Sequence, residues 1–138
     1  MAGSIEALSA YRYERACDDL NSSKILFRAE QYNQSLNRSY YAVFHGMRAV
    51  NALDGFDSGK HSGVISHFNH YHVKNGDFSA AASRIVSSAS EQREHADYLD
   101  FYIASKQDAE KQIENAELFL GCVKDFLVSK GIALSASC

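Results

Sequence analysis

The chain has 138 residues and a formal net charge of −3, with 46% apolar and 22% charged residues. This length and composition predict one folded domain over residues 1–138 and exclude a disordered chain. The pI near 6.0 indicates no overall basic surface of the kind used in broad nucleic-acid binding. Any contact with RNA would therefore depend on a few local arginines.

Neither a membrane span nor a signal peptide is expected. No apolar run approaches the roughly 20 residues that a transmembrane helix needs, and residues 1–15 lack the basic stretch and apolar segment of a signal peptide. The three cysteines, Cys17, Cys122 and Cys138, are odd in number, widely spaced and without the spacing of metal ligands, which fits a reducing compartment. We therefore expect a soluble cytoplasmic protein with no membrane partner.

The chain contains no proline to interrupt long helices, and its apolar spacing predicts five. The expected helices span residues 4–30, 33–53, 60–74, 79–94 and 105–130. Ser4 and Ser105 are expected to cap two of them, the latter with Asp108 three residues on. Residues 133–138 are expected to fray. Because no segment alternates convincingly like a strand, the predicted fold is an all-α, antiparallel bundle of four to five helices.

The second predicted helix has two different faces when it is projected at about 100° per residue. The core face carries apolar side chains, namely Leu36, Tyr40, Val43, Phe44, Met47 and Val50. The opposite face carries polar groups beside small residues, namely Gln34, Arg38, Tyr41, Ala42, His45, Arg48, Ala49 and Ala52. On that face Arg38 and His45 are two turns apart, about 10 Å along the helix axis.

The polar face has two interpretations. Most such faces are solvated, but they usually carry lysine and glutamate, whereas Ala42, Ala49 and Ala52 flank the polar groups here. Small residues let another helix backbone approach closely, and the apolar face already serves the core. We therefore expect a homodimer through this face, whose twofold axis would bring two copies of Arg38 and His45 into one cleft.

Arginine and histidine in one cleft favour a particular chemistry. Imidazole moves protons near neutral pH, and guanidinium binds phosphate through two parallel hydrogen bonds. Without a carboxylate cluster for magnesium, the pair suits metal-independent RNA cleavage, in which the 2′-hydroxyl attacks the adjacent phosphate. His45 would be the general acid or base and Arg38 the phosphate clamp. The sequence permits this chemistry without demanding it.

Weaker candidates for binding lie on or near the same face. Tyr41 shares the face, and Arg48, one turn past His45, either extends the phosphate-binding stripe or is simply exposed. Lys60 and His61 begin the third predicted helix, where the helix amino terminus favours an anion. The ordinary alternative is a first turn with a solvated lysine.

Other polar groups have structural interpretations. Four histidines crowd the third predicted helix, namely His61, His67, His70 and His72. His67 and His70 could share a face, but neither cysteine nor carboxylate completes a tetrahedral set, so no metal is expected. Arg93 and Asp97 are spaced i, i+4, which predicts an ion pair rather than catalysis.

The order and spacing of several motifs resemble a known family. "NRSYYAVFHGMRAV", then "KHSGVISHFNHYHVKNGDF" and "REHADY", resemble the HEPN superfamily (higher eukaryotes and prokaryotes nucleotide-binding), in particular its small stand-alone prokaryotic members. The resemblance covers nearly the whole chain and implies a bundle of four to five helices that forms a homodimer. It also implies an Arg-x(4–6)-His motif at the dimer cleft of ribonuclease members, which Arg38 and His45 match as Arg-x6-His.

Two positions depart from the family's ribonuclease toxins. Active nucleases often have Asn, Asp or His where Ser39 follows the arginine. Toxins that a nucleotidyltransferase antitoxin modifies with AMP often have tyrosine where Met47 stands. Two functions are therefore retained: a cofactor-free RNase toxin neutralised by a nucleotidyltransferase-type antitoxin, or a non-catalytic adaptor that binds nucleotide or a nucleotidyltransferase partner. A plain helical scaffold is the remaining alternative.

Overall fold

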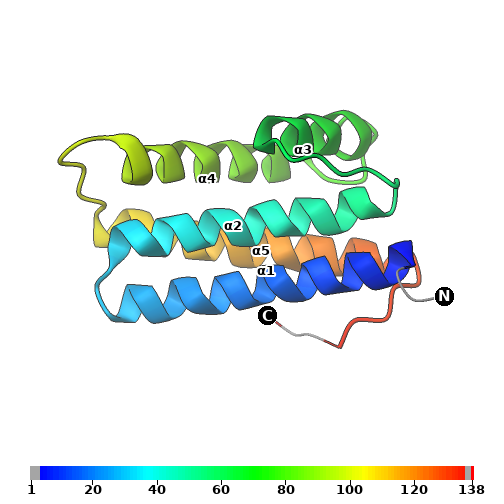
Figure 1. Cartoon of the computed structure of the whole chain (residues 1–138), viewed down its shortest axis with the longest axis horizontal. Coiled ribbons are helices and arrows are strands. Elements are labelled where there is room, and N and C mark those ends of the chain that lie inside the picture. The colour runs from blue at the N-terminus through cyan, green and yellow to red at the C-terminus, as the bar shows by residue number, and fades with distance from the viewer. Residues whose placement is uncertain (1–3, 136–137) are drawn as a thin grey trace.

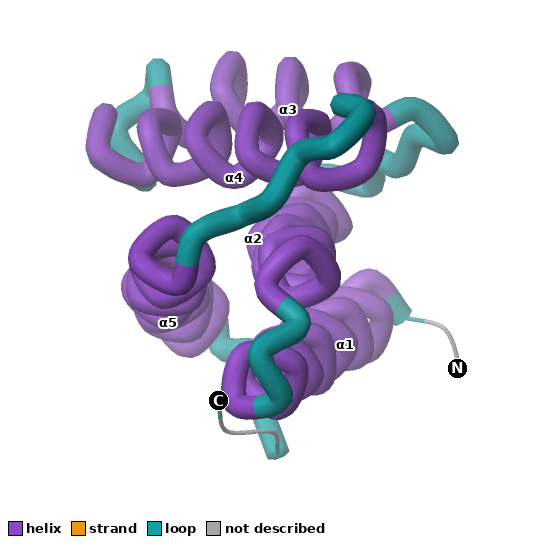
Figure 2. The backbone as a smooth tube through the Cα atoms, turned by 90° about the vertical axis from the view of Figure 1, so that its left-hand side faces the viewer, coloured by secondary structure: helices purple, strands orange, loops and turns teal. Residues whose placement is uncertain are grey.

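Five α-helices and one π-helical segment form the computed structural model, which describes residues 4–135 and 138. In chain order the elements are α1 (Ile5–Arg28), α2 (Tyr32–Ala52), α3 (His61–Phe68), η1 (Asn69–Val73), α4 (Ala80–Tyr98) and α5 (Lys106–Ser129). The described residues contain no strand, and the predicted all-α bundle is confirmed. Figures 1 and 2 show α3 and α4 along one side of α2, with α1 and α5 on the other. No helix in the described part of the chain has both the length and the hydropathy needed to cross a membrane.

The helix caps follow the sequence closely. Ser4 Oγ accepts a hydrogen bond from the Ala7 backbone N–H at 3.0 Å, and Ser105 Oγ accepts one from the Asp108 N–H at 2.9 Å. Both predicted N-caps are therefore confirmed. The helix α1 ends at Arg28, short of the predicted residue 30, because Glu30 adopts a left-handed backbone conformation with φ of 62°.

The core is built around α2, which contacts α1, α3, α4 and α5. Its predicted core face is buried throughout, at Leu36, Tyr40, Val43, Phe44, Met47 and Val50. Gly46 allows α5 to approach, since a Cβ there would lie only 2.7 Å from Leu120 Cδ2. The helix that carries both Arg38 and His45 is thus held rigidly by packing.

The small residues of α2 are covered by α1 of the same chain. Ala42, Ala49 and Ala52 are 0%, 0% and 2% exposed, and Ser9 Oγ of α1 donates a hydrogen bond to the Ala49 carbonyl at 2.7 Å. The expectation that these alanines line an interface with a second copy is therefore wrong. They do admit another helix backbone, but that helix is α1, whose buried residues include the small Ser9 and Ala16.

The segment after α3 contains a π-helical turn. In this turn the Lys74 N–H donates to the Asn69 carbonyl, five residues earlier. A regular α-helix would place Tyr71 on the same face as Val64 and Phe68. Instead Tyr71 is exposed, and His72 is buried beside the core. The extra residue in the π-helical turn therefore places His72, rather than Tyr71, on the side that faces the core.

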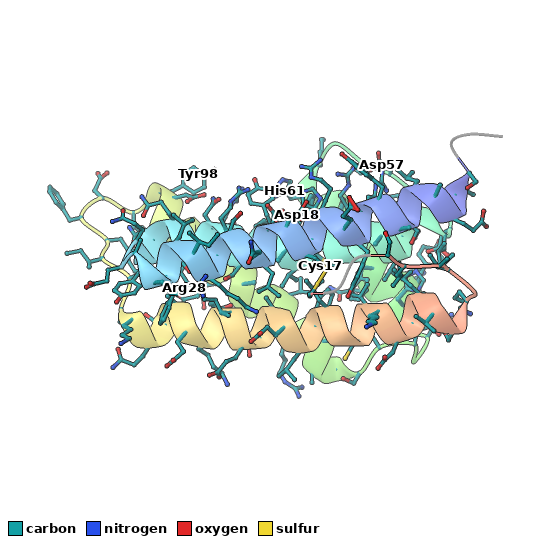
Figure 3. All side chains as sticks on the ribbon, turned by 90° about the horizontal axis from the view of Figure 1, so that it is seen from below. Cys17, Asp18, Arg28, Asp57, His61 and Tyr98 are labelled. Carbon is teal, nitrogen blue, oxygen red and sulfur yellow. A yellow bond between two sulfur atoms is a disulfide. The ribbon has the colours of Figure 1, made fainter. Side chains whose placement is uncertain are left out.

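The carboxyl-terminal segment is attached to the bundle. Leu134 packs against the core, and a disulfide joins Cys138 to Cys17 of α1, 121 residues away in sequence (Figure 3). The expectation of fraying is wrong for these residues, while 136–137 lie outside the described residues. The cysteine count, which indicated a reducing compartment, did not predict this disulfide, because the two cysteines meet only in the folded chain. Cys122 is free and exposed.

Candidate functional site

The two helices α1 and α2 bring Arg38 and His45 to one carboxylate, that of Asp19. Arg38 Nη1 donates to Asp19 Oδ1 at 3.1 Å, and His45 Nε2 lies 3.7 Å from Asp19 Oδ2. The Arg38 side chain is 37% exposed and that of His45 only 10%. The guanidinium therefore reaches solvent while the imidazole is nearly covered. Projection of α2 alone could not reveal Asp19, because it comes from α1.

Two buried atoms at this point have no hydrogen-bond partner among the described residues, namely Asp19 Oδ2 and His45 Nδ1. Such atoms are uncommon in folded proteins, since an unpaired buried polar group costs about 1–3 kcal/mol. The guanidinium of Arg38 is also held by Asn37, whose Oδ1 accepts from Nη2 at 2.8 Å. Unpaired buried polar atoms beside an accessible, oriented guanidinium mark this place as the candidate site.

Arginines gather around His45 from both helices. They are Arg12 and Arg15 of α1 and Arg38 and Arg48 of α2. Arg12 Nη2 and Arg48 Nη2 share the Asp57 carboxylate, at 3.1 Å and 3.2 Å from its oxygens. Although the whole chain is acidic, this surface therefore concentrates positive charge, which favours the approach of an anion.

The surroundings of His45 keep its imidazole neutral. Burial is the main cause, the positive charges of the four arginines add to it, and together they lower the pKa of His45 from 6.5 to about 4. At pH 7 the ring is therefore a neutral imidazole, with one nitrogen free to accept a proton, and not an imidazolium acid. Burial also raises the pKa of Asp19, against the opposing charges of Arg38 and Arg15.

The depressed pKa of His45 predicts a pH-dependent stability. Between pH 6.5 and about 4 this histidine is protonated in the unfolded chain but stays unprotonated in the folded protein. The free energy of unfolding therefore falls as the pH is lowered through this window, by on the order of 2 kcal/mol between pH 7 and pH 5. Urea unfolding of the wild type and of His45→Gln at the two pH values measures this component. Parallel pH dependence in the two proteins would contradict the assignment.

Aromatic side chains extend the site toward α3 and α4. The Arg38 guanidinium lies over the Tyr41 ring, 4.8 Å from its centroid, and the Tyr41 hydroxyl accepts from Arg93 Nη2 at 3.2 Å. The His61 ring lies 5.7 Å from that of Tyr41, and His61 Nδ1 is 2.8 Å from the Tyr40 hydroxyl. Tyr41 and His61 therefore belong to the same surface as Arg38.

Figure 3 shows Asp57, His61 and Tyr98 along one edge of the molecule. Lys60, by contrast, is an exposed residue at the start of α3 and forms no ion pair within the described residues. Arg93 Nε forms the predicted ion pair with Asp97, 3.2 Å from Oδ2. The guanidinium of Arg93 also lies over the Tyr40 ring at 4.9 Å, a contribution that the sequence spacing did not reveal.

Ser39 and Met47 point away from the site. Ser39 Oγ is 2.6 Å from Ser23 Oγ of α1, and Ser39 is 1% exposed. Met47 is completely buried in the core. The two residues that depart from the toxin pattern therefore serve packing, and neither lies where it could contact a phosphate on the Arg38 side chain.

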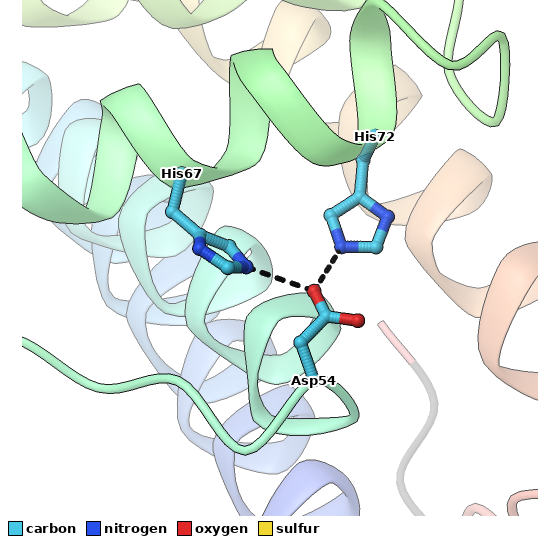
Figure 4. Close-up of side chains that lie close together, drawn as sticks. All are labelled: Asp54, His67 and His72. Carbon is cyan, nitrogen blue, oxygen red and sulfur yellow. Dashed lines mark hydrogen bonds and ion pairs between the residues drawn. The ribbon is translucent and has the colours of Figure 1, made fainter.

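A second polar cluster lies beyond the carboxyl end of α2. Asp54 Oδ2 is 2.9 Å from His67 Nε2 and 2.6 Å from His72 Nε2 (Figure 4). The sequence-based pairing of His67 with His70, and the expectation that no carboxylate joins them, are wrong. The π-helical turn brings His72 into position instead of His70, and the turn after α2 supplies Asp54.

Comparison with known proteins assigns this helical bundle to a family. Residues 9–126 match the HEPN domain, so the chain belongs to the HEPN domain family. A "UPF0332 protein" of Thermotoga maritima is 29% identical, over 88% of this chain and 92% of that protein. A Methanocaldococcus jannaschii protein named "Putative toxin" is 33% identical, over 83% and 84% of the two chains. A second protein of that name from the same organism is 29% identical, over 86% and 81%.

Proposed function

We propose that this protein is a metal-independent endoribonuclease toxin that cuts RNA at the surface formed by Arg38, Asp19 and His45. The observation that carries the proposal is the meeting of an accessible guanidinium with a neutral imidazole that four arginines surround. A general base must be unprotonated at the working pH, and a phosphate needs positive charge nearby. Two relatives carry the name "Putative toxin", which supports the toxin part of this proposal.

The proposed reaction uses the substrate's own 2′-hydroxyl as nucleophile. His45 removes the proton of that hydroxyl as its oxygen forms a bond to the adjacent phosphorus. The bond from phosphorus to the 5′-oxygen breaks, and that oxygen takes a proton from the imidazolium or from water. Arg38 binds the phosphate oxygens, on which negative charge develops. The products are a 2′,3′-cyclic phosphate and a free 5′-hydroxyl.

Asp19 has a positioning role in this proposal. Its carboxylate orients the Arg38 guanidinium and faces His45 Nε2. A phosphate must compete with this carboxylate for the guanidinium. Burial of Asp19, which raises its pKa, makes loss of its charge less costly than for an exposed aspartate.

The test of the proposed function is RNA cleavage by purified protein in buffer that contains EDTA. Fragments with 2′,3′-cyclic phosphate ends are expected, and expression without a neutralising partner should slow growth. A nucleotidyltransferase-type antitoxin is the partner that we propose. Intact RNA after incubation with folded wild-type protein would refute the nuclease.

The geometry of Arg38 also favours a second function, that of a non-catalytic adaptor. Both Asp19 and Asn37 already accept hydrogen bonds from its guanidinium, and His45 is nearly covered. An adaptor would use the same positive surface to bind nucleotide or a nucleotidyltransferase partner. Retained binding of either one, without RNA cleavage, would decide in its favour.

A homodimer remains part of the proposal, with an interface other than the buried alanines. The chain around the end of α4 exposes apolar side chains, of which Phe101 is 100% and Ile103 88% exposed. Tyr98, 70% exposed, begins this stretch and lies under the Arg93 guanidinium at the edge of the site. Burial of these side chains against a second copy would place two sites near each other.

Light scattering should therefore give a mass near twice 15.3 kDa. Phe101→Asp should yield a monomer, because the charge would be buried in the interface, and aspartate tolerates the positive φ of this residue. Leu118→Asp, at an exposed apolar residue of α5, is the matched control and should stay dimeric. A monomeric wild type at tens of micromolar would exclude a composite cleft.

A further inference from the structure

The cluster of Asp54, His67 and His72 plays no part in the proposed RNA chemistry. Each of the three residues offers one atom that could bind a metal, and these atoms all lie within 4.8 Å of one another. His67 is 11% and His72 6% exposed at the side chain, so both imidazoles are largely removed from solvent. Three donors of this kind, converging from separate segments, form the ligand set that zinc sites with an open position use.

The backbone brings the two histidines together in an unusual way. They are five residues apart, and on a regular α-helix residues at i and i+5 diverge by about 140°. His72 lies within the π-helical turn η1, which follows the helix of His67 and brings His72 toward the side of His67. Such turns are rare and occur frequently at functional sites. This backbone feature is an observation independent of the side-chain cluster.

Asp77 gives His72 the environment of a metal ligand. Its Oδ2 lies 3.1 Å from His72 Nδ1, the ring nitrogen that faces away from Asp54. A carboxylate on the second nitrogen fixes the ring and leaves Nε2 to bind a cation, as is usual for histidines that ligate metals. The His67 ring is held differently, stacked on Phe56 with centroids 4.0 Å apart.

We propose that Asp54, His67 and His72 bind a divalent transition-metal cation, with Zn²⁺ as the preferred ion. Bonds of about 2.0–2.2 Å to each ligand place tetrahedral ligand atoms about 3.3 Å apart. The pairs at 2.6 Å and 2.9 Å need only small side-chain rotations to open to that spacing. The cation takes the place of the imidazole protons that otherwise bridge to Asp54 Oδ2.

The cluster also opens to a space for a further ligand. A pocket of about 330 Å³ is lined by Asp54, His72, Tyr71, Asp77, Phe126 and Lys130, among others. A cation with three protein ligands can therefore keep a water molecule in its fourth position. The carboxylates of Asp54 and Asp77 outnumber the ammonium group of Lys130, which lies over the Phe126 ring at 5.3 Å. The electrostatic balance near the cluster therefore favours a cation.

The site is tested with ZnCl₂ and tag-free protein that has been treated with EDTA and then dialysed free of it. Calorimetry should show one Zn²⁺ bound per chain, and Zn²⁺ should raise the melting temperature. His67→Gln and His72→Gln should lose this binding. Asp77→Asn, which alters only the support of His72, should weaken it by about 10–100-fold. His70→Gln changes an exposed neighbour outside the cluster and is the matched control.

Cobalt provides a readout that needs no variant. Co²⁺ bound in a four-coordinate site should give strong visible absorption that Zn²⁺ displaces in a one-to-one ratio. Circular dichroism establishes whether each variant folds. If His72→Gln does not fold, the cobalt spectrum of the wild type tests the metal site instead. No saturable Zn²⁺ binding at micromolar protein, or equal losses in His67→Gln and His70→Gln, would overturn the proposal. RNA cleavage in EDTA is expected in either case, so the two proposals fail separately.

Discussion

His45→Ala is expected to reduce RNA cleavage by about 10²–10⁴-fold, because it removes the group that accepts the proton of the 2′-hydroxyl. The loss should appear in single-turnover cleavage of a labelled RNA, at a pH where the wild-type imidazole is neutral. Since the pKa of His45 is lowered to about 4, cleavage by the wild type should persist well below pH 6.5. An ordinary histidine acting as a base would already lose activity there.

Arg38→Ala is expected to reduce RNA cleavage about as much as His45→Ala does. Of the other arginines near His45, Arg12 and Arg48 do not replace it, because both are engaged with Asp57. Arg38→Lys should restore only part of the activity, since an ammonium cannot form two parallel hydrogen bonds to a phosphate. A lysine that works as well as arginine would mean that only the charge matters.

Two control variants separate these effects from general loss of charge or of histidine. Arg28→Ala removes an exposed arginine at the end of α1, and His70→Ala removes an exposed histidine of η1. Both should cleave RNA at the wild-type rate. Cleavage that continues unchanged in His45→Ala and Arg38→Ala would identify a contaminating nuclease and refute the assignment of this surface.

The sequence predicted most of the fold because local signals coincide with tertiary packing. Apolar spacing identified the core face of α2, and the serine caps located the starts of α1 and α5. The same projection placed Arg38 and His45 together on a second face, but it did not show that α1 covers much of that face and leaves His45 only 8% exposed. The core face and the caps depend on helical periodicity and on contacts between residues close in sequence, which can be recognised in one amino-acid sequence.

The remaining parts of the site depend on contacts between distant segments. Asp19 lies on α1, and no spacing within α2 indicates that its carboxylate meets Arg38. The alanines of α2 do not reveal their partner either, because a small-residue stripe indicates that a helix approaches but not which helix. Likewise, the register of His72 could not be predicted, since a π-helical turn has no strong sequence signal and shifts every following side chain.

Phe44→Ala is expected to lower the free energy of unfolding by about 3–5 kcal/mol, the range typical of a large aromatic removed from a core. Phe44 is 5% exposed, and its ring lies 4.2 Å from that of His61 and 5.9 Å from that of Tyr40. Its removal leaves a cavity between α2 and α3 that rigid neighbours cannot fill. Urea unfolding at pH 7, followed by circular dichroism, measures the change.

The stability of His45→Ala tests whether the next residue along α2, His45, serves mainly packing or mainly the proposed chemistry. The imidazole is almost as buried as the Phe44 ring, at 8% exposure, yet its Nδ1 has no hydrogen-bond partner among the described residues. Removing the ring loses packing but also relieves the cost of an unpaired buried nitrogen, so the expected loss is less than about 2 kcal/mol. A loss as large as that of Phe44→Ala would make His45 a structural residue. A small loss of stability together with a large loss of cleavage is expected of a residue retained for its chemistry.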